Sequence, residues 1–128
     1  MSLFLDTCYV KKSMLIGVIY RKPNGNIGSF LSKLEIVLNA IATSGKTCII
    51  MGDFNINLLI NSNRNTKTYT DLFTIYGYYP FINKPTRVST HSATVIDHIW
   101  CNNTDMVTGG GILLCDISDH FATFFLLD

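Results

Sequence analysis

The chain has 128 residues, a hydrophobic fraction of 48% and a formal net charge of +1 at pH 7. The length fits one domain, the hydrophobic fraction excludes an intrinsically disordered chain, and the charge excludes a basic arm that binds nucleic acid by electrostatics alone. No apolar run reaches the ~20 residues that a membrane-spanning helix needs, and the N-terminus lacks the basic region of a secretory signal. Charged residues make up only 15% of the chain, so we expect a partner, or a missing part of the domain, to cover some of its surface.

The first half of the chain predicts a strand, a helix and a second strand. Residues 13–20 form a short apolar run that ends in a turn rich in Pro, Asn and Gly. Residues 29–43 carry apolar side chains at helical spacing, with Ser29 as the expected N-cap and Gly45 as the expected C-terminal stop. Residues 46–51 are continuously apolar, as in a strand that is buried on both faces. A strand–helix–strand unit of this kind is expected to be parallel and right-handed.

The second half predicts a loop at 55–67, a shorter helix at 68–76 and mostly loop at 80–94. Three strands are expected to close the chain, at residues 95–101, 112–115 and 121–127. The three glycines at 109–111 lack the following Lys-Ser/Thr and the helix of a phosphate-binding loop, so a hairpin or a strand lead-in fits them better. The aromatic residues between 69 and 81 are expected in the core rather than as a base-stacking platform. The order of elements predicts an α/β fold with a mixed sheet and two main helices.

The cysteines predict buried, reduced thiols. They are Cys8, Cys48, Cys101 and Cys115. No two of them form a C-x-x-C pair, so their spacing does not favour a zinc site. Three of the four lie in apolar, strand-like runs, where a free cysteine behaves as a small apolar residue. Reduced thiols are typical of an intracellular protein, and we expect the chain in the nucleus or the cytoplasm.

Polar side chains gather near the ends of the predicted strands. Asp53 and Asn55 follow the buried second strand, and in an extended chain two such residues face the same way. Asp97 lies inside an apolar strand, where a lone carboxylate is costly unless it is paired. Asp119 and His120 follow another apolar segment. Because ligands of α/β sheets bind outside the carboxyl ends of the strands, this set of residues predicts a metal-assisted hydrolytic site.

Each of these residues also has a purely structural interpretation. Asp53 could cap a turn together with Asn55, and Asp119 could be an N-cap or a turn residue. His98 is expected to be a strand residue that faces away from Asp97, because successive strand residues point to opposite faces. His91 lies in a loop rich in Ser and Thr and is expected to be solvated.

Five short motifs occur along the chain in the order seen in a known superfamily. They span residues 19–24 (IYRKPN), 52–55 (GDFN), 85–87 (PTR), 92–99 (SATVIDHI) and 118–120 (SDH). With these motifs the chain resembles the endonuclease/exonuclease/phosphatase superfamily, and within it the apurinic-type endonuclease domain of non-LTR (LINE-type) retrotransposons. The resemblance implies a DNase I-like four-layer α/β sandwich, in which two sheets pack together with helices on both outer faces.

The resemblance also implies roles for five residues in phosphodiester hydrolysis. Asp53 would orient or deprotonate the attacking water, and Asn55 would hold Asp53 and a phosphate oxygen. His120 would contact the scissile phosphate, and Asp97 would hold His120 in its charged, correctly oriented form. Asp119 would bind the divalent metal, Mg²⁺ or Mn²⁺, or lie near it. This agrees with the need for an oriented nucleophile and for positive charge on the developing oxyanion.

Four further residues are implied in binding DNA. Tyr20 and Asn24 would contact the phosphate from the first loop, and Thr94 corresponds to a small hydroxyl residue near the DNA backbone. Arg87, in the Pro-Thr-Arg loop, would contribute to the same phosphate- and DNA-binding surface. The two loops that carry Tyr20 and Arg87 favour the retrotransposon type over other members of the superfamily.

The resemblance covers only the C-terminal half of the family's domain. Residues 1–128 are therefore expected to be a partial domain, whose N-terminal half, with the family's metal-binding Glu and a further Asn, is absent. The full domain would nick one strand of duplex DNA and leave a 3′-hydroxyl, and a reverse transcriptase domain in the same polyprotein is a further expected partner. We expect the chain alone to be weakly active or inactive.

Two other functions stay open on the sequence. The same residues would serve another phosphodiesterase or phosphatase of the superfamily, acting on a phosphoinositide, sphingomyelin or poly(A). The chain could also be a catalytically dead domain that binds a protein or a nucleic acid.

Overall fold

A computed structural model describes the backbone of residues 2–9 and 12–128 and the side chains from Ser13 onward. The main sheet has five strands in the order β1-β2-β3-β7-β4. Their bounds are Ser2–Tyr9 (β1), Lys12–Tyr20 (β2), Thr47–Asp53 (β3), Asp97–Cys101 (β7) and Tyr79–Pro80 (β4). The other elements are the helices α1 (Ile27–Ser44) and α2 (Arg64–Ile75), the short 3-10 helix η1 (Thr104–Met106), and the two-stranded ladders β5 (Arg87–Val88) with β6 (Ala93–Thr94) and β8 (Val107–Leu113) with β9 (Ala122–Leu127).

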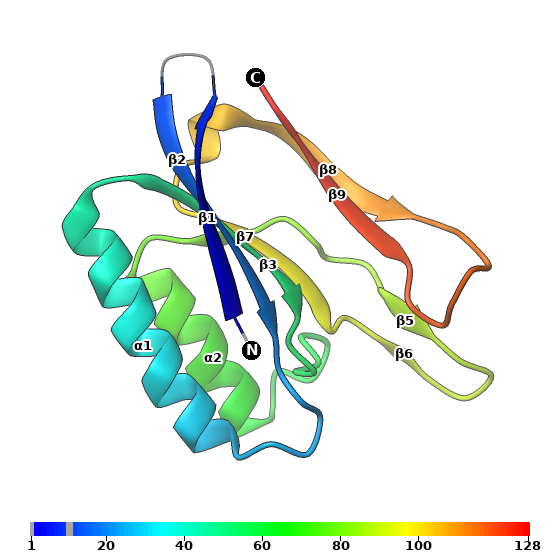
Figure 1. The fold of residues 1–128 in the computed structure, drawn as a ribbon. Helices are drawn as coiled ribbons and strands as arrows, with labels where there is room; N and C mark the ends of the chain where they lie inside the picture. The colour runs from blue at the N-terminus through cyan, green and yellow to red at the C-terminus, as the bar shows by residue number, and fades with distance from the viewer. Residues whose placement is uncertain (1, 10–11) are drawn as a thin grey trace.

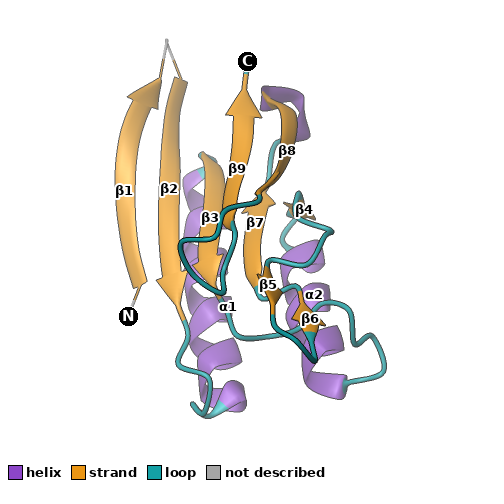
Figure 2. Cartoon of the chain, turned by 90° about the vertical axis from the view of Figure 1, so that its right-hand side faces the viewer, coloured by secondary structure: helices purple, strands orange, loops and turns teal. Residues whose placement is uncertain are grey.

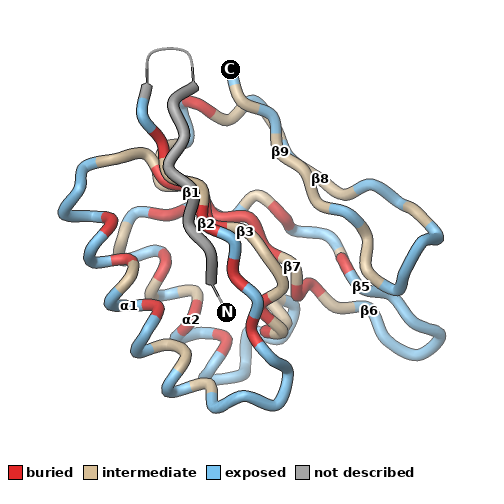
Figure 3. The backbone as a smooth tube through the Cα atoms, viewed as in Figure 1, coloured by how far each residue is buried: buried red, intermediate tan, exposed pale blue. Residues whose placement is uncertain are grey.

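These elements form three layers, with the main sheet in the middle. Both helices lie against one face of the sheet, and the β8–β9 hairpin lies over part of the other face (Figures 1 and 2). Within β3, Cys48 and Ile50 pack in the cluster that contains the helices, whereas Ile49 and Met51 pack in the cluster that contains the hairpin. The prediction that this strand is buried on both faces is therefore confirmed, and Figure 3 shows β3 and β7 buried between the two outer layers.

The sheet mixes parallel and antiparallel pairs, as predicted. β2 and β3 are parallel and are connected through α1, whereas β1 with β2, β3 with β7 and β4 with β7 are antiparallel. Parallel strands that are joined through a helix end at the same edge of the sheet. The loops that follow β2 and β3 are therefore neighbours, which is what the site described below depends on.

Both helices begin earlier than predicted. The N-cap of α1 is Asn26, whose side chain accepts a hydrogen bond from the backbone N–H of Ser29 at 2.8 Å, so the prediction of Ser29 as the cap is wrong. Gly45 has a left-handed φ of 67° and ends α1 as predicted. Helix α2 begins at Arg64, behind the cap Asn63. The prediction misses its first turn because that turn is polar throughout, including the buried Thr66, and carries no apolar periodicity.

Two strands differ from the predictions. β1 is not predicted by the sequence, because Asp6 interrupts the apolar run of an edge strand. β8 begins at Val107 and includes the glycines at 109–111, so these glycines belong to the β8–β9 hairpin, one of the two predicted alternatives, and lie inside its first strand rather than in a lead-in. A side chain at Gly110 would come within 3.2 Å of the Phe124 carbonyl oxygen and 3.4 Å of Phe81, so glycine allows the close packing found here.

The aromatic residues between 69 and 81 are mostly core residues. Tyr69, Phe73 and Tyr78 are buried, whereas Tyr79 is exposed. Phe73 stacks on Trp100, with the ring centroids 4.4 Å apart. The interpretation of this segment as core is therefore confirmed for its buried members.

The described cysteines are unpaired. Cys48 and Cys101 are buried, Cys115 is partly buried, and all three are free thiols. Burial raises the pKa of Cys48 to about 11, so its thiol stays protonated at neutral pH. The side chain of Cys8 lies outside the described residues. Within the part of the chain that the structure describes, neither helix has the length and apolar character needed to cross a membrane.

Candidate active site

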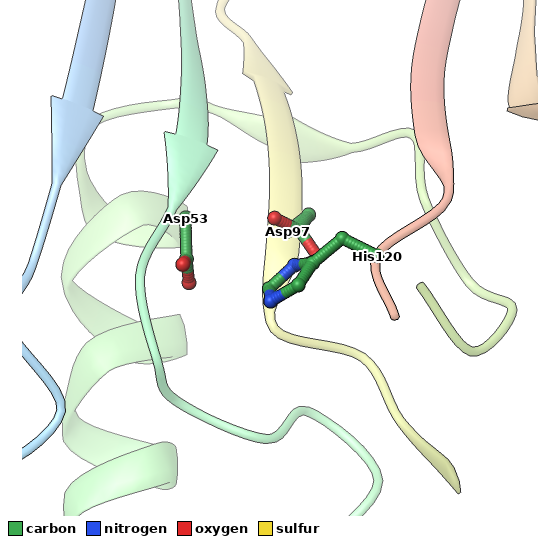
Figure 4. Close-up of side chains that lie close together, drawn as sticks. All are labelled: Asp53, Asp97 and His120. Atoms are coloured by element: carbon green, nitrogen blue, oxygen red, sulfur yellow. The ribbon is translucent and has the colours of Figure 1, made fainter. Parts of the chain in front are cut away.

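Asp53, Asp97 and His120 come together at one edge of the main sheet (Figure 4). Asp53 ends β3, Asp97 begins β7, and the two are direct partners in the antiparallel register. His120 reaches them from the segment before β9. One ligand atom from each of the three residues lies within 4.8 Å of those of the other two. Three segments that are far apart in the sequence thus place two carboxylates and an imidazole in one small volume.

Gly52 is required by the backbone immediately before Asp53. Its φ is 144°, and a Cβ atom there would lie 1.9 Å from the carbonyl oxygen of Ile19 on the neighbouring strand. No side chain fits at that distance, so only glycine lets β3 stay paired with β2 up to Asp53. The glycine of the GDFN motif is thus required for a steric reason.

Asn55 turns the chain away from the strand direction. Its φ is 49°, in the left-handed region, so the expectation of an extended chain between Asp53 and Asn55 is wrong. The backbone N–H of Asn55 donates to Asp53 Oδ1 at 3.1 Å, so Asp53 does cap a turn, as its structural interpretation proposes. The side-chain amide of Asn55 donates to the carbonyl oxygen of Arg21 at 2.7 Å. Asp53 therefore caps a turn and also belongs to the three-residue cluster.

Asp97 and His120 form a hydrogen-bonded pair. The distance between His120 Nδ1 and Asp97 Oδ2 is 2.9 Å, and the side chains are 31% and 16% exposed, respectively. Asp97 therefore has the partner that a carboxylate in an apolar strand needs, and this partner is His120. Because Nδ1 is used by Asp97, Nε2 is the ring nitrogen that is left for a ligand.

Thr86, for which no role is predicted, holds the backbone on both sides of this pair. Its Oγ1 accepts hydrogen bonds from the backbone N–H groups of Ile96 (3.2 Å) and Asp97 (3.1 Å). Its carbonyl oxygen accepts from the N–H of Phe121, next to His120, at 2.7 Å. Thr86 is fully buried, and it connects the start of β7 to the His120 segment. The only signal in the sequence is its place in the Pro-Thr-Arg motif.

The electrostatics of the cluster favour a cation. Burial raises the pKa of the Asp53 carboxyl, the negative charge of Asp97 raises it further, and hydrogen bonding by Asn55 and the charge of His120 lower it. Two facing carboxylates repel each other, and a positive ion between them would relieve that repulsion. Carboxylate oxygens are also the donors that Mg²⁺ and Mn²⁺ prefer. The residues present therefore fit a divalent metal, with Asp53 and Asp97 supplying oxygen ligands and His120 beside them.

Asp119, the predicted metal ligand, lies outside this cluster of three. Its Oδ2 accepts a hydrogen bond from Arg87 Nε at 2.7 Å, and both side chains are about half exposed. That hydrogen bond lowers the pKa of the Asp119 carboxyl. Arg87 also forms a β-bridge to His120, so the ion pair joins the two segments that carry the predicted site residues. The metal-binding role of Asp119 and the DNA-binding role of Arg87 stay predictions.

The remaining predicted residues, Tyr20, Asn24 and Thr94, lie on other elements of the chain. Tyr20 ends β2 as the register partner of Asp53, and 53% of its surface is exposed. Asn24 is exposed in the loop that follows β2. Thr94 is partly buried in β6, opposite Arg87 in the β5–β6 ladder. The structure places Tyr20 beside Asp53, Asn24 in the loop after β2 and Thr94 in the short strand β6.

His98 faces the opposite side of β7, as predicted. It is buried, it stacks on Phe54 with the ring centroids 5.1 Å apart, and its Nδ1 lies 2.8 Å from the Tyr69 hydroxyl. Its Nε2 lies 3.0 Å from the carbonyl oxygen of Val95. Burial lowers the pKa of His98 to about 4, so the ring is neutral at pH 7. The predicted solvation of His91 also agrees with its exposure.

The sequence of residues 9–120 matches the Endonuclease/Exonuclease/phosphatase family. No curated protein sequence matches the chain at a significant level. Among solved structures, the endonuclease domain of TRAS1, a telomere-specific non-LTR retrotransposon, is similar with a TM-score of 0.82 and 15% identity, over 98% of this chain and 63% of that one. The 3′-5′ exonuclease NExo from Neisseria meningitidis is similar with a TM-score of 0.70 and 13% identity, over 90% of this chain and 61% of that one.

A phosphatase shares the same fold. The mannosyl-6-phosphatase from Bacteroides thetaiotaomicron is similar with a TM-score of 0.64 and 15% identity, over 93% of this chain and 52% of that one. At such identities the likeness concerns the fold alone. The chain spans less than two thirds of each of these three structures. The predicted fold class, a mixed α/β sheet with two main helices, is confirmed.

Proposed function

The chain belongs to the endonuclease/exonuclease/phosphatase family, and from that membership we propose that it is part of a metal-dependent DNA endonuclease of the retrotransposon type. The observation that carries the proposal is the convergence of Asp53, Asp97 and His120, from three separate segments, within 4.8 Å of one another. This is the set of groups that hydrolysis of a phosphodiester needs: a base for water, and a hydrogen-bond donor for the phosphate. The likeness to a retrotransposon endonuclease over 98% of the chain supports the choice of DNA as the substrate.

In the proposed reaction, Asp53 accepts a proton from the attacking water, whose oxygen forms a bond to phosphorus. The bond from phosphorus to the 3′ oxygen breaks, and that oxygen takes up a proton from solvent water and leaves as a 3′-hydroxyl, while Asp53 later returns its proton to solvent. Burial and the negative charge of Asp97 raise the pKa of Asp53, which makes its carboxylate a stronger base than that of a solvated aspartate. His120, held by Asp97 at 2.9 Å, donates from Nε2 to the phosphate.

A divalent metal, Mg²⁺ or Mn²⁺, would polarise the phosphoryl oxygen and offset the charge that develops in the transition state. Asp53 and Asp97 would supply oxygen ligands, since a cation between the two carboxylates would relieve the repulsion between them. We also propose that Asp119, whose carboxylate pairs with the Arg87 guanidinium in this structure, would be a further carboxylate for the metal site. Asn55 has its amide nitrogen on the Arg21 carbonyl, so its Oδ1 is the atom left for a ligand.

The DNA backbone would cross the edge of the sheet between the loop after β2 and the β5–β6 ladder. Tyr20 and Asn24 would contact phosphates from the first side, and Thr94 and Arg87 from the second. Tyr20 fits this role best, because it is half exposed and adjacent to Asp53. Hydroxyl and amide contacts of this kind position the backbone without reading the base sequence.

We propose that residues 1–128 are part of a larger domain and that the remainder of this domain, with a reverse transcriptase domain in the same polyprotein, is a partner. The coverage of 63% of the TRAS1 endonuclease domain supports this. So do apolar side chains that are exposed on and beside the β8–β9 hairpin, such as Leu114, Ile117 (91% exposed) and Leu126. Exposed apolar surface of this kind marks a contact with another polypeptide.

Plasmid nicking with Mg²⁺ tests the proposal, with EDTA as the metal-free control. We expect little or no nicking by the chain alone and clear nicking when the chain is joined to the remainder of the domain. Asp53→Asn should then lower the rate by about 10²- to 10⁴-fold, because the base is lost. Asp105→Asn, at an exposed aspartate of η1, makes the same chemical change away from the site and should leave the rate unchanged.

Three results would count against parts of the proposal. Nicking by the chain alone that Asp53→Asn abolishes would contradict the need for a further part of the domain. No nicking by the joined form would contradict the endonuclease. Release of phosphate from a phosphoinositide, with none from duplex DNA, would instead identify another substrate class of the family.

A further inference from the structure

Arg21 is a buried cation in the loop after β2. Only 8% of its surface is exposed, although arginine is seldom buried unless it is paired. Its guanidinium has five N–H donors, and the structure gives an acceptor to each of them. The acceptors are the backbone carbonyl oxygens of Phe54 for Nε (2.8 Å), Lys22 and Gly25 for Nη1 (3.2 and 3.1 Å), and Pro23 and Asn55 for Nη2 (3.5 and 3.1 Å).

These acceptors belong to two different loops. Three of them lie in the loop that follows β2, residues 21–26, which also carries Asn24 and begins beside Tyr20. The other two, Phe54 and Asn55, lie in the loop that follows β3, directly after Asp53. The same guanidinium therefore holds the loop with the proposed phosphate contacts and the loop with the proposed base.

The backbone of Arg21 adds two more connections between these loops. Its N–H donates to the carbonyl oxygen of Asp53 at 2.9 Å, and its own carbonyl oxygen accepts from the side-chain amide of Asn55 at 2.7 Å. The guanidinium carbon also lies 5.8 Å from the centroid of the Phe30 ring, which connects the arrangement to α1. Four hydrogen bonds thus cross directly from Arg21 to residues 53–55.

We propose that Arg21 is a positioning residue that sets the loop after β2 against the Asp53–Asn55 turn. Because all five of its N–H groups already have protein acceptors, Arg21 itself is not a substrate contact. It acts through Asn55, whose left-handed backbone and amide orientation it holds, and through the loop that carries Asn24. Its effect on catalysis rests on the proposed function, whereas its effect on the two loops does not.

The chemistry of the site requires a guanidinium rather than any cation. A lysine ammonium has three donors on one atom, whereas the planar guanidinium spreads five donors over three nitrogens in a fixed fork. Carbonyl oxygens from two loops can therefore be reached at once by arginine but not by lysine. Arg21→Lys keeps the charge and most of the aliphatic chain, so it isolates the geometry of the donors.

Hydrogen exchange of backbone amides, measured by NMR on the chain without metal or substrate, tests the proposal. Arg21→Lys should raise the exchange rates of the Gly25 and Asn55 amides by about ten-fold or more, the effect of losing a hydrogen bond that holds each loop. The amides of β3 and β7 should keep their wild-type rates. Arg64→Lys, at an exposed arginine of α2, is the matched control and should change no loop amide.

Chemical rescue separates positioning from a general contribution to the fold. In Arg21→Ala, N-ethylguanidinium replaces the missing atoms and should restore slow exchange at Gly25 and Asn55, whereas ethylammonium should not. In the joined form that nicks DNA, the same additive should restore the rate. If Arg21→Ala does not fold, the Arg21→Lys comparison decides.

Two outcomes would overturn the proposal. One is loop exchange in Arg21→Lys that equals that of wild type. The other is a uniform rise in exchange across β3 and β7, which would make Arg21 a general stabiliser of the fold. Neither measurement needs catalysis, so an absence of nicking would count against the proposed endonuclease and would leave the positioning result to be judged separately.

Discussion

Two histidines that each follow an aspartate in the sequence, His98 in β7 and His120 in the segment before β9, lie on opposite sides of β7 and have opposite surroundings. Both His98 and His120 use Nδ1 in a hydrogen bond, but the partner of His98 is the Tyr69 hydroxyl and the partner of His120 is the Asp97 carboxylate. His98 is buried among aromatic rings on the helix side, and His120 is partly exposed at the edge of the sheet. The partner and the solvent, rather than the residue type, decide which histidine can take part in chemistry.

The hydrogen bonds around His98 permit one protonation state. Trp100 Nε1–H only donates, so the Tyr69 oxygen accepts from it at 3.0 Å, and the Tyr69 O–H donates to His98 Nδ1. His98 Nε2–H then donates to the carbonyl oxygen of Val95. This chain of donors is complete with a neutral ring, and a second proton on Nδ1 would remove the acceptor that Tyr69 needs. His98 is thus a structural residue, whereas His120 pairs with a carboxylate at the partly exposed end of the sheet.

Removing His120 should have the largest effect on activity. In the form of the protein that nicks DNA, His120→Ala should lower the nicking rate by about 10²- to 10⁴-fold, because the donor to the phosphate is lost. The free energy of unfolding should fall by about 1–3 kcal/mol, because Asp97, which is only 16% exposed, loses its hydrogen-bond partner. Plasmid nicking and urea denaturation measure the two effects. His91→Ala, at an exposed histidine, is the control, and an equal loss of activity there would contradict the assignment.

Removing His98 should instead affect stability. His98→Leu leaves the Tyr69 hydroxyl and the Val95 carbonyl without their partners in the core, so we expect a loss of about 2–4 kcal/mol in the free energy of unfolding at pH 7.5. Urea denaturation followed by Trp100 fluorescence measures it. His91→Leu makes the same change in a solvated loop and should cost little. A His98→Leu protein as stable as wild type would show that the hydrogen-bonded chain contributes nothing.

Acid should remove the contribution of His98 to the free energy of unfolding. Its pKa is about 4 in the folded chain, against a reference of 6.5. Between these values the unfolded chain binds a proton that the folded chain does not, so the wild type loses stability as pH falls from 6.5 to 4, by up to about 3 kcal/mol. The difference in unfolding free energy between wild type and His98→Leu should therefore shrink between pH 7.5 and pH 4.5. Parallel pH curves for the two proteins would contradict the pKa assigned to His98.

The sequence predicts most of the fold because its signals are local. The helical spacing of apolar residues in 29–43 and the unbroken apolar run at 46–51 depend only on neighbours in the chain, and both elements are present. The elements that the sequence misses have weak local signals. The first turn of α2 is polar, and Gly110 in β8 is explained only by the close approach of Phe81 and Phe124.

By itself, the sequence determined the order of the two helices and the longer strands from β2 onward, the burial of β3 on both faces and the motifs that indicate the family, because apolar periodicity and short motifs are properties of the chain. Only the tertiary structure decided which polar side chains meet. The register of β3 against β7 pairs Asp53 with Asp97, and the hairpin brings His120 to them. The contacts of Arg21 are the clearest case that the sequence cannot predict. Its five acceptors are backbone carbonyl oxygens, and their directions depend on the folded conformation of two loops rather than on residue type.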